Sequence, residues 1–292
     1  MHTTRARSRK GLAAMLTLVS LALFGCANPS APASAATPAG KSQGTTASPA
    51  TSEPPTSQTP MSPPAPSKPP HPTALVYRGP AACDGCPEAA AALLARHDFA
   101  VHYIGKGQEY AFSAAVLGSA AVYVQPGGAD TMTVDQAWQI LRQENPGVDE
   151  EIRHYVSNGG HYMGFCMGGY LAGTPGFALL APGDSEQYIA TSNAVVTTEA
   201  NTLIKVTWRG RQHEMYFQDG PAFTIESQPA EVLARYPNGP IAAAVLAFGA
   251  GRVAVVGPHP EATADWYAEY GLADHSAEGA ALGDDLLATM LK

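Results

Sequence analysis

Cys166 stands at the centre of a stretch whose composition suits a reactive side chain. The apolar run at residues 161–165 leads into the sequence Gly-Phe-Cys-Met-Gly at residues 164–168. A strand, a sharp turn and the beginning of a helix in this order predict a nucleophile elbow, whose usual pattern is G-x-S-x-G. Flanking glycines let the strand and helix pass closely, and N–H groups at the helix start stabilise a thiolate. The alternative is that Cys166 is an inert buried thiol between two packing glycines.

His259 is the candidate base for this thiol. It follows an apolar strand predicted at residues 252–257 and lies between two prolines, which limit its backbone freedom. A thiol nucleophile needs an imidazole to take its proton and later to protonate a leaving amine. Glu261 would orient the imidazole through a carboxylate hydrogen bond. The alternatives are a turn histidine without a chemical role and a carboxylate that favours a helix N-terminus.

Backbone N–H groups near Cys166 would complete such a site. The N–H of Met167 would point at the oxyanion formed during attack on a carbonyl, and Gly127 and Gly128 follow a strand predicted at residues 120–124. Glycine suits a second donor because no side chain hinders the approach of the substrate. The alternative for Gly127 and Gly128 is an ordinary turn.

The first half of the chain alternates strand and helix patterns, which predicts a parallel sheet covered on both faces. The expected strands are residues 74–77, 99–104, 120–124 and 161–165, and the expected helices are residues 87–97, 134–142 and 148–157. Reactive groups gather at the carboxyl ends of the strands in such sheets. The pattern therefore predicts that Gly127, Gly128 and Cys166 meet at one edge.

The pattern changes after Gly173. Residues 186–248 predict an antiparallel extension with strands at residues 194–196, 203–208, 213–217 and 241–248, and with an Asn-Gly turn signal at residues 238–239. A last strand then returns to the main sheet and places His259. Closing helices are expected at residues 263–270 and 284–291.

Three motifs, Pro-Gly-Gly at 126–128, Gly-x-Cys-x-Gly-Gly at 164–169 and His-Pro-Glu at 259–261, occur in an order and spacing that resemble the class I glutamine amidotransferase-like superfamily. The segments at residues 74–80 and 216–221 are similar to its biotin-protein ligase N-terminal branch. The resemblance covers residues 74–292. It implies an α/β fold with a mostly parallel, doubly wound sheet, as in flavodoxin-like folds, and a triad of Cys166, His259 and Glu261.

The N-terminal region predicts export and tethering. Residues 1–26 combine a basic start with an apolar run, as in a secretory signal, and end in Leu-Phe-Gly-Cys, which resembles a bacterial lipobox with lipidation at Cys26. The alternative is plain secretion with cleavage further along the chain. Residues 27–73 are rich in Pro, Ser, Thr and Ala, contain no aromatic residue and are expected to form a disordered linker. We expect a bacterial cell-envelope protein held on a membrane by its lipid, with residues 74–292 as one extracytoplasmic domain.

Charge and histidine spacing narrow the possible partners. Removing the four basic residues of the signal segment from the formal net charge of −8 leaves −12, which argues against nucleic acid. The histidines at positions 97, 102, 154, 213 and 275 show no ligand spacing, and His161 is expected to be structural. The sequence therefore indicates no metal ion and no cofactor.

Cys83 and Cys86 form Cys-x-x-Cys in the loop after the first strand. In an exported chain a disulfide is expected, which leaves Cys166 as the free thiol; a redox switch is the alternative. The loop lies at the carboxyl end of its strand, so it is expected to border the site.

These features favour a tethered cysteine hydrolase that acts on an amide or related acyl bond of a small molecule or peptide. Amidotransferase domains normally pass ammonia to a synthase, but no synthase partner is apparent. The second hypothesis is a non-catalytic ligand-binding lipoprotein that retains the fold, and the third is a redox protein centred on Cys83 and Cys86. The region between residues 174 and 248 is expected to set specificity.

Overall fold

The computed structural model describes residues 71–129, 131–226 and 228–292. The predicted signal segment, its Cys26 and the linker up to residue 70 lie outside the described residues. No helix within the described residues is long and apolar enough to cross a membrane.

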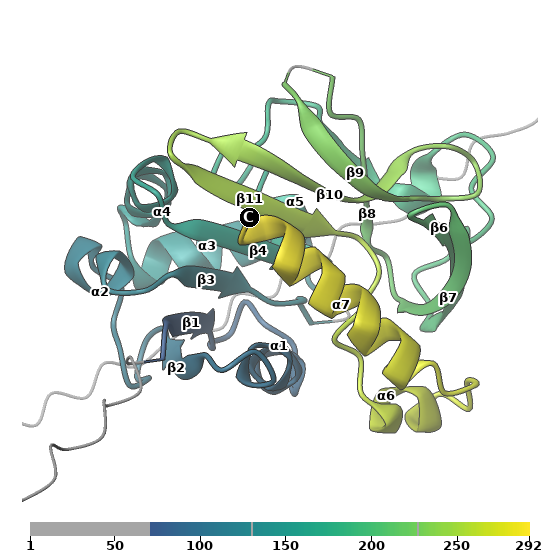
Figure 1. Ribbon diagram of the computed structural model, residues 1–292, viewed down its shortest axis with the longest axis horizontal. Helices are drawn as coiled ribbons and strands as arrows, with labels where there is room; N and C mark the ends of the chain where they lie inside the picture. Colours follow the sequence, from purple (N-terminus) through teal and green to yellow (C-terminus); the bar gives the residue numbers. More distant parts are fainter. Residues whose placement is uncertain (1–70, 130, 227) are drawn as a thin grey trace, which may run out of the picture. The chain divides into compact units, whose positions relative to one another are not determined.

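One twisted sheet forms the centre of the domain (Figure 1). Its strand order is β2 (Ala100–Ile104), β1 (Thr73–Tyr77), β3 (Val122–Gln125), β4 (His161–Phe165), β11 (Gly251–Val256), β10 (Ile241–Phe248), β9 (Ala230–Arg235), β6 (Thr202–Trp208) and β7 (Arg211–Phe217). Two short strands, β5 (Ser185–Gln187) and β8 (Pro221–Phe223), pair with each other, and β8 also pairs with β10.

The sheet consists of a parallel half and an antiparallel half that meet at β11. Strands β2, β1, β3, β4 and β11 are parallel neighbours, whereas β11, β10, β9, β6 and β7 pair antiparallel. The predicted α/β class, a doubly wound parallel sheet with an antiparallel extension, is therefore confirmed.

Helices cover both faces of the parallel half (Figure 1). On one face lie α1 (Cys86–Ala95) and α7 (Ser276–Met290), and on the other lie α2 (Ala114–Gly118), α3 (Val134–Glu144), α4 (Val148–Ser157) and α5 (Met167–Leu171). A 3₁₀ turn, η1 (Tyr188–Ala190), and α6 (Ala264–Glu269) complete the described elements.

Each central strand contributes to two cores because successive side chains point to opposite faces. In β11, Ala254 and Val256 pack with the face of α1 and α7, whereas Val253 and Val255 pack with the face of α3 and α4. All four side chains are fully buried. This burial on both faces explains why the strands that carry the site read as continuous apolar runs.

The structure corrects two expectations from the sequence. Residues 194–196 form no strand: Val195 is 59% exposed, and its N–H donates to the hydroxyl of Tyr188 instead of a neighbouring strand. Helix α7 begins at Ser276 rather than at residue 284. Its early turns contain Gly279 and Gly283, which weaken the helical signal but allow close packing on Pro260 and Leu93.

Sequence patterns did not reveal five elements, namely α2, β5, η1, β8 and β9. Each has few residues and no clean periodicity, so its structure depends on tertiary pairing. Strands β5 and β8 matter for the site because they bring residues 185–187 and 218–221 beside α5.

Candidate active site

Cys166 occupies the sharp turn between β4 and α5, as predicted. Its backbone has φ 46° and ψ −105°, a conformation that a residue with a side chain rarely adopts. The N–H of Cys166 donates to the carbonyl of Val256 in β11 at 3.0 Å, which ties the turn to the neighbouring strand. The thiol is therefore held in a strained position at the carboxyl edge of the sheet.

The glycines around Cys166 are required by close backbone contacts. A Cβ added to Gly164 would lie 2.3 Å from the carbonyl oxygen of Gly168, and one added to Gly168 would lie 2.0 Å from the carbonyl oxygen of Gln125. Real Cβ atoms do not approach oxygen this closely, so α5 would have to move away from β3 and β4. The sequence argument that small residues allow the strand and helix to pass closely is confirmed.

His259 reaches the same edge because β11 runs parallel to β4. Val256, the last residue of β11, pairs with Phe165, the last residue of β4. The two strands therefore end side by side, and they are followed by Gly257 and Cys166. The N–H of His259 donates to the carbonyl of Tyr216 at 2.9 Å, which fixes the loop after β11. Residues nearly one hundred positions apart in sequence thus become neighbours.

Glu261 lies within hydrogen-bond distance of the imidazole of His259. Nδ1 of His259 and Oε1 of Glu261 are 2.9 Å apart, and both residues are buried. Burial alone would lower the pKa of His259, but the charges of Glu261 and Cys166 and hydrogen bonds to both raise it to about 10. The imidazole is therefore protonated at neutral pH when both neighbours are charged.

The thiol has two neighbours of different chemistry. One is His259, whose pKa the neighbouring Cys166 helps to raise. The other is the carbonyl of Gln218, to which Sγ donates at 3.5 Å. Because Nδ1 of His259 is engaged with Glu261, Nε2 is the nitrogen available to the thiol. The structure thus brings Cys166, His259 and Glu261 together.

Gly127 and Gly128 lie beside these groups. A Cβ on Gly127 would be 2.9 Å from Cε1 of His259 and 3.2 Å from Sγ of Cys86, and one on Gly128 would be 2.9 Å from the Met167 side chain. Among the described residues, the N–H groups of Gly127, Gly128 and Met167 donate no hydrogen bond. These are the three N–H groups that the sequence predicted as donors to an oxyanion.

Cys83 and Cys86 are disulfide-bonded, and Cys166 is a free cysteine. The N–H of Cys83 donates to the carbonyl of Gly127 at 3.0 Å. The disulfide therefore borders the site, as its position after β1 predicted, and it braces the loop that contains the glycine pair.

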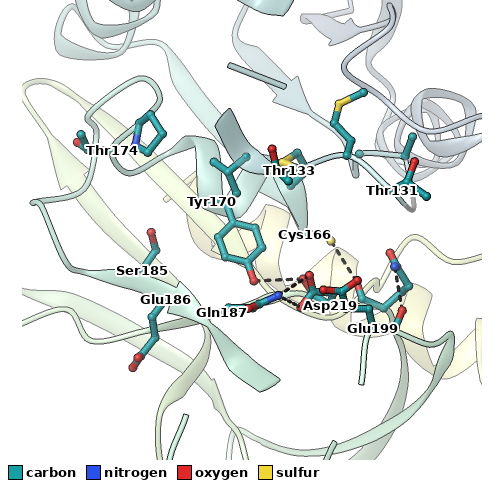
Figure 2. Close-up of a pocket in the computed structure, with 17 residues that line it drawn as sticks. Thr131, Thr133, Cys166, Tyr170, Thr174, Ser185, Glu186, Gln187, Glu199 and Asp219 are labelled. Carbon is teal, nitrogen blue, oxygen red and sulfur yellow. Dashed lines mark hydrogen bonds between the residues drawn. The ribbon is translucent and has the colours of Figure 1, made fainter. Parts of the chain in front are cut away.

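A cavity of about 460 Å³ opens on the Cys166 side, and we call it the thiol-side cavity (Figure 2). Its wall includes the carboxylates of Glu186, Glu199 and Asp219, together with Tyr170 and Gln187. Nε2 of Gln187 donates to both carboxylate oxygens of Asp219 at 2.9 Å. Burial of the Asp219 carboxylate raises its pKa. Its described wall contains no Lys or Arg.

A second cavity, of about 330 Å³, opens on the His259 side, and we call it the imidazole-side cavity. It is lined by Cys83, Asp84, Cys86, Gly128, Ala129, Asn201, Tyr216, Gln218, His259, Trp266, Glu269 and Tyr270. Gly128, Ala129 and Gln218 line both cavities and form the ridge between them.

Sequence reasoning missed most of these walls. Besides the predicted catalytic and oxyanion residues, Tyr216, Gln218 and Asp219 had a signal because they lie within the segment at 216–221 that the family resemblance singled out, and the loop of Cys83 and Cys86 was expected to border the site. Residues 174–248, where specificity is expected to reside, supply much of the thiol-side wall. Among the described residues, no group of three or more His, Cys, Asp or Glu side chains is arranged to hold a metal ion.

Residues 73–176 match the family described as biotin-protein ligase, N terminal. This range contains Gly127, Gly128 and Cys166 but ends before His259 and Glu261. The resemblance expected from the sequence motifs is confirmed by this match. No curated protein matches the chain.

Solved structures of amidotransferases are among the similar ones. A glutamine amidotransferase is 17% identical, with 71% of this chain and 98% of that chain covered and a TM-score of 0.47. PurLQS from Thermotoga maritima is 17% identical, with 76% and 100% covered and a TM-score of 0.49. The exo-beta-1,4-mannosidase Op5Man5 from Opitutaceae bacterium strain TAV5 is 16% identical, with 76% and 37% covered and a TM-score of 0.47.

Proposed function

From the premise that residues 73–176 match the family described as biotin-protein ligase, N terminal, we propose that the protein is a cysteine hydrolase of amide or related acyl bonds. Cys166 is the proposed nucleophile, His259 the acid and base, and Glu261 the residue that orients the imidazole. The N–H groups of Gly127, Gly128 and Met167 are the proposed oxyanion donors.

One observation carries this proposal: a cysteine in a strained elbow lies beside a histidine that a buried carboxylate holds. Cys166 has φ 46°, and His259 is 2.9 Å from Glu261 through Nδ1 and Oε1. A merely structural thiol would have no need of a strained backbone or of a buried ion pair beside it. Strained conformations and buried charges are both unfavourable and concentrate at functional sites.

The proposed reaction proceeds through a thioester. Sγ of Cys166 attacks the carbonyl carbon of the substrate, and the carbonyl oxygen gains negative charge beside the proposed oxyanion donors. His259 gives its proton to the amide nitrogen as the C–N bond breaks, and the amine leaves. His259 then takes a proton from water, the resulting hydroxide attacks the thioester, and the proton passes to Sγ as the acid leaves.

Two measurements on the full chain test this function: its alkylation by iodoacetamide and its hydrolysis of amides. Iodoacetamide is expected to label Cys166, and hydrolysis across a panel of amides, peptides and glutamine is expected to disappear in both Cys166→Ala and Cys166→Ser. Peptide mass spectrometry separates labelling of Cys166 from labelling of any other cysteine. A Cys166→Ala protein with undiminished hydrolysis would show that the proposed nucleophile is wrong.

A second candidate is a ligand-binding lipoprotein without catalysis. The contact between Sγ of Cys166 and the carbonyl of Gln218 favours it, because a thiol that donates there is not poised for attack. Under this alternative, iodoacetamide would label Cys166 no faster than a model thiol, and ligand binding would survive in Cys166→Ala. Rapid labelling together with hydrolysis that depends on Cys166 excludes it.

We also propose that the protein is anchored to a membrane of the cell envelope through a lipidated Cys26. The support is the basic and apolar signal pattern followed by Leu-Phe-Gly-Cys at residues 23–26. Mass spectrometry of the N-terminal peptide from bacterially expressed full chain tests the anchor. A peptide that begins beyond Cys26, without lipid, would contradict it.

A further inference from the structure

The two cavities divide the site into chemically different halves. The thiol-side cavity contains Cys166 in its wall, and the imidazole-side cavity contains His259. They meet at the ridge of Gly128, Ala129 and Gln218, beside the proposed oxyanion donors. A carbonyl carbon attacked by Sγ must therefore lie near this ridge, with the rest of its substrate extending into one or both cavities.

General acid catalysis decides which end of the substrate enters which cavity. The imidazole that protonates the amide nitrogen must lie on the side of the leaving group. The acyl part then extends over Cys166 into the thiol-side cavity, and whatever is attached to the nitrogen extends into the imidazole-side cavity. The size and chemistry of the second cavity therefore describe the leaving amine.

Aromatic rings form one wall of the imidazole-side cavity. The ring of Tyr216 has its centroid 5.9 Å from that of His259, and the ring of Trp266 lies at 5.4 Å, both in edge-on arrangements. Tyr270 continues this wall next to Tyr216, with ring centroids 6.3 Å apart, and is 43% exposed. The wall runs from the imidazole to the solvent and offers apolar area together with ring faces.

Two carboxylates accompany the rings. Asp84 and Glu269 line the same cavity and are exposed, while its described wall has no Lys or Arg. An amine leaves such a reaction neutral and gains a proton in water at neutral pH, so its product form is a cation. Aromatic faces and carboxylates are the groups that attract an organic ammonium ion.

The volume of the cavity separates an organic amine from ammonia. A molecule the size of water or ammonia needs only about 30 Å³. The imidazole-side cavity has about 330 Å³, which lies in the range of pockets that bind organic ligands. An enzyme that released only ammonia would not need a cavity of this size, lined by aromatic rings, on the leaving-group side of His259.

We infer that the substrate is an N-substituted amide whose leaving group is an organic amine bound in the imidazole-side cavity. This inference rests on the proposed hydrolase function and defines its substrate class. The rings of Tyr216, Trp266 and Tyr270 pack on the carbon skeleton of the amine. Asp84 and Glu269 attract its charge, and His259 donates the proton to its nitrogen.

Matched substrates test the inference in the full chain. Each acyl group in a panel is presented as its primary amide and as its N-(2-phenylethyl) amide, and kcat/KM is measured for both. We expect the substituted amide to be preferred by about 10-fold, the size of effect that packing of its phenyl ring against the aromatic wall gives. Tyr270→Ala should reduce this preference several-fold, because it removes one ring of the proposed wall. Leu291→Ala is the matched control because Leu291 is 42% exposed, close to the 43% of Tyr270, and lies outside the cavity.

A second readout is independent of turnover. In the full chain, 2-phenylethylamine is expected to slow alkylation of Cys166 by iodoacetamide, whereas 3-phenylpropionate and ammonium chloride are not. Tyr270→Ala should weaken this protection, and Leu291→Ala should leave it unchanged.

The outcomes separate the inference from the function beneath it. If primary amides are hydrolysed through Cys166 at least as well as substituted ones, and the amine gives no protection, the inference is overturned and the hydrolase remains. If the amine protects Cys166 but no amide is hydrolysed through it, the hydrolase is overturned and the amine cavity remains.

Discussion

The backbone at position 166 is strained, so replacing alanine with glycine there should cost less stability than the same replacement at an ordinary position. The comparison uses Cys166→Gly and Cys166→Ala, which both lack the thiol and differ only by a methyl group. Cys166 has φ 46° and ψ −105° and is 6% exposed. A residue with a side chain in such a conformation loses about 1–3 kcal/mol, and glycine avoids most of this loss.

The magnitude follows from a control at an ordinary position. Ala172 follows α5, is fully buried and has φ −64°. There, Ala172→Gly should cost about 1.5 kcal/mol, from about 0.5–1 kcal/mol of backbone entropy and about 0.8 kcal/mol of lost methyl burial. The same exchange at position 166 should range from a loss of about 0.5 kcal/mol to a gain of about 1.5 kcal/mol, because relief of strain offsets these losses.

Urea and thermal unfolding of the full chain measure the difference. The two sites should differ by about 2 kcal/mol, or by about 4–8 °C in Tm for a domain of this size. If replacing alanine with glycine lowers the free energy of unfolding as much at position 166 as at position 172, the claim that this turn stores strain is refuted.

Other predictions concern the groups around the thiol. Glu261→Gln should reduce kcat/KM by at least about 100-fold, because a neutral amide no longer favours the charged imidazole; unchanged steady-state kinetics would rule out the orienting role. The pKa of His259 is raised from about 6.5 to about 10, so the stability from its pair with Glu261 is full below pH 6.5 and is lost as the pH rises toward 10. Urea unfolding across this range should show the decline, and the slope should flatten in Glu261→Gln. Gly127→Ala should lower kcat about 10-fold or more because its Cβ would lie 2.9 Å from His259 Cε1, whereas Gly118→Ala, with open space around it, should leave kcat unchanged in the same assay. Reduction of the disulfide between residues 83 and 86 should lower the free energy of unfolding by about 2 kcal/mol or less, since it closes a very short loop; hydrolysis that is unchanged by mild reduction would argue against a redox switch.

The reactive core of the site was predictable because it depends on local patterns at strand ends. The glycines beside Cys166 indicated a tight turn, and the apolar run before His259 indicated a buried strand. Parallel strands end at a common edge, so the two residues were expected to meet. The observed pairing of Val256 with Phe165 confirms this expectation.

The walls of the site were not predictable in the same way. Residues 185–187 and 221–223 pair with each other, and their few residues carry no periodic signal. Trp266 and Tyr270 belong to a short helix and its end, and their position beside His259 depends on how that helix packs on Tyr216. Such contacts arise from tertiary packing between segments far apart in sequence, so patterns in a single chain do not specify them.

The place of β11 in the sheet has a consequence for synthesis of the chain. This strand lies between β4 and β10, and it is formed by residues 251–256, close to the C-terminus. A growing chain therefore completes β4 long before the neighbour that covers its second edge exists. Until residue 256 has been made, the strand that carries the nucleophile has an open, apolar edge that can pair with other chains. Premature termination between the end of β4 and this point should yield an aggregating fragment rather than a smaller folded domain.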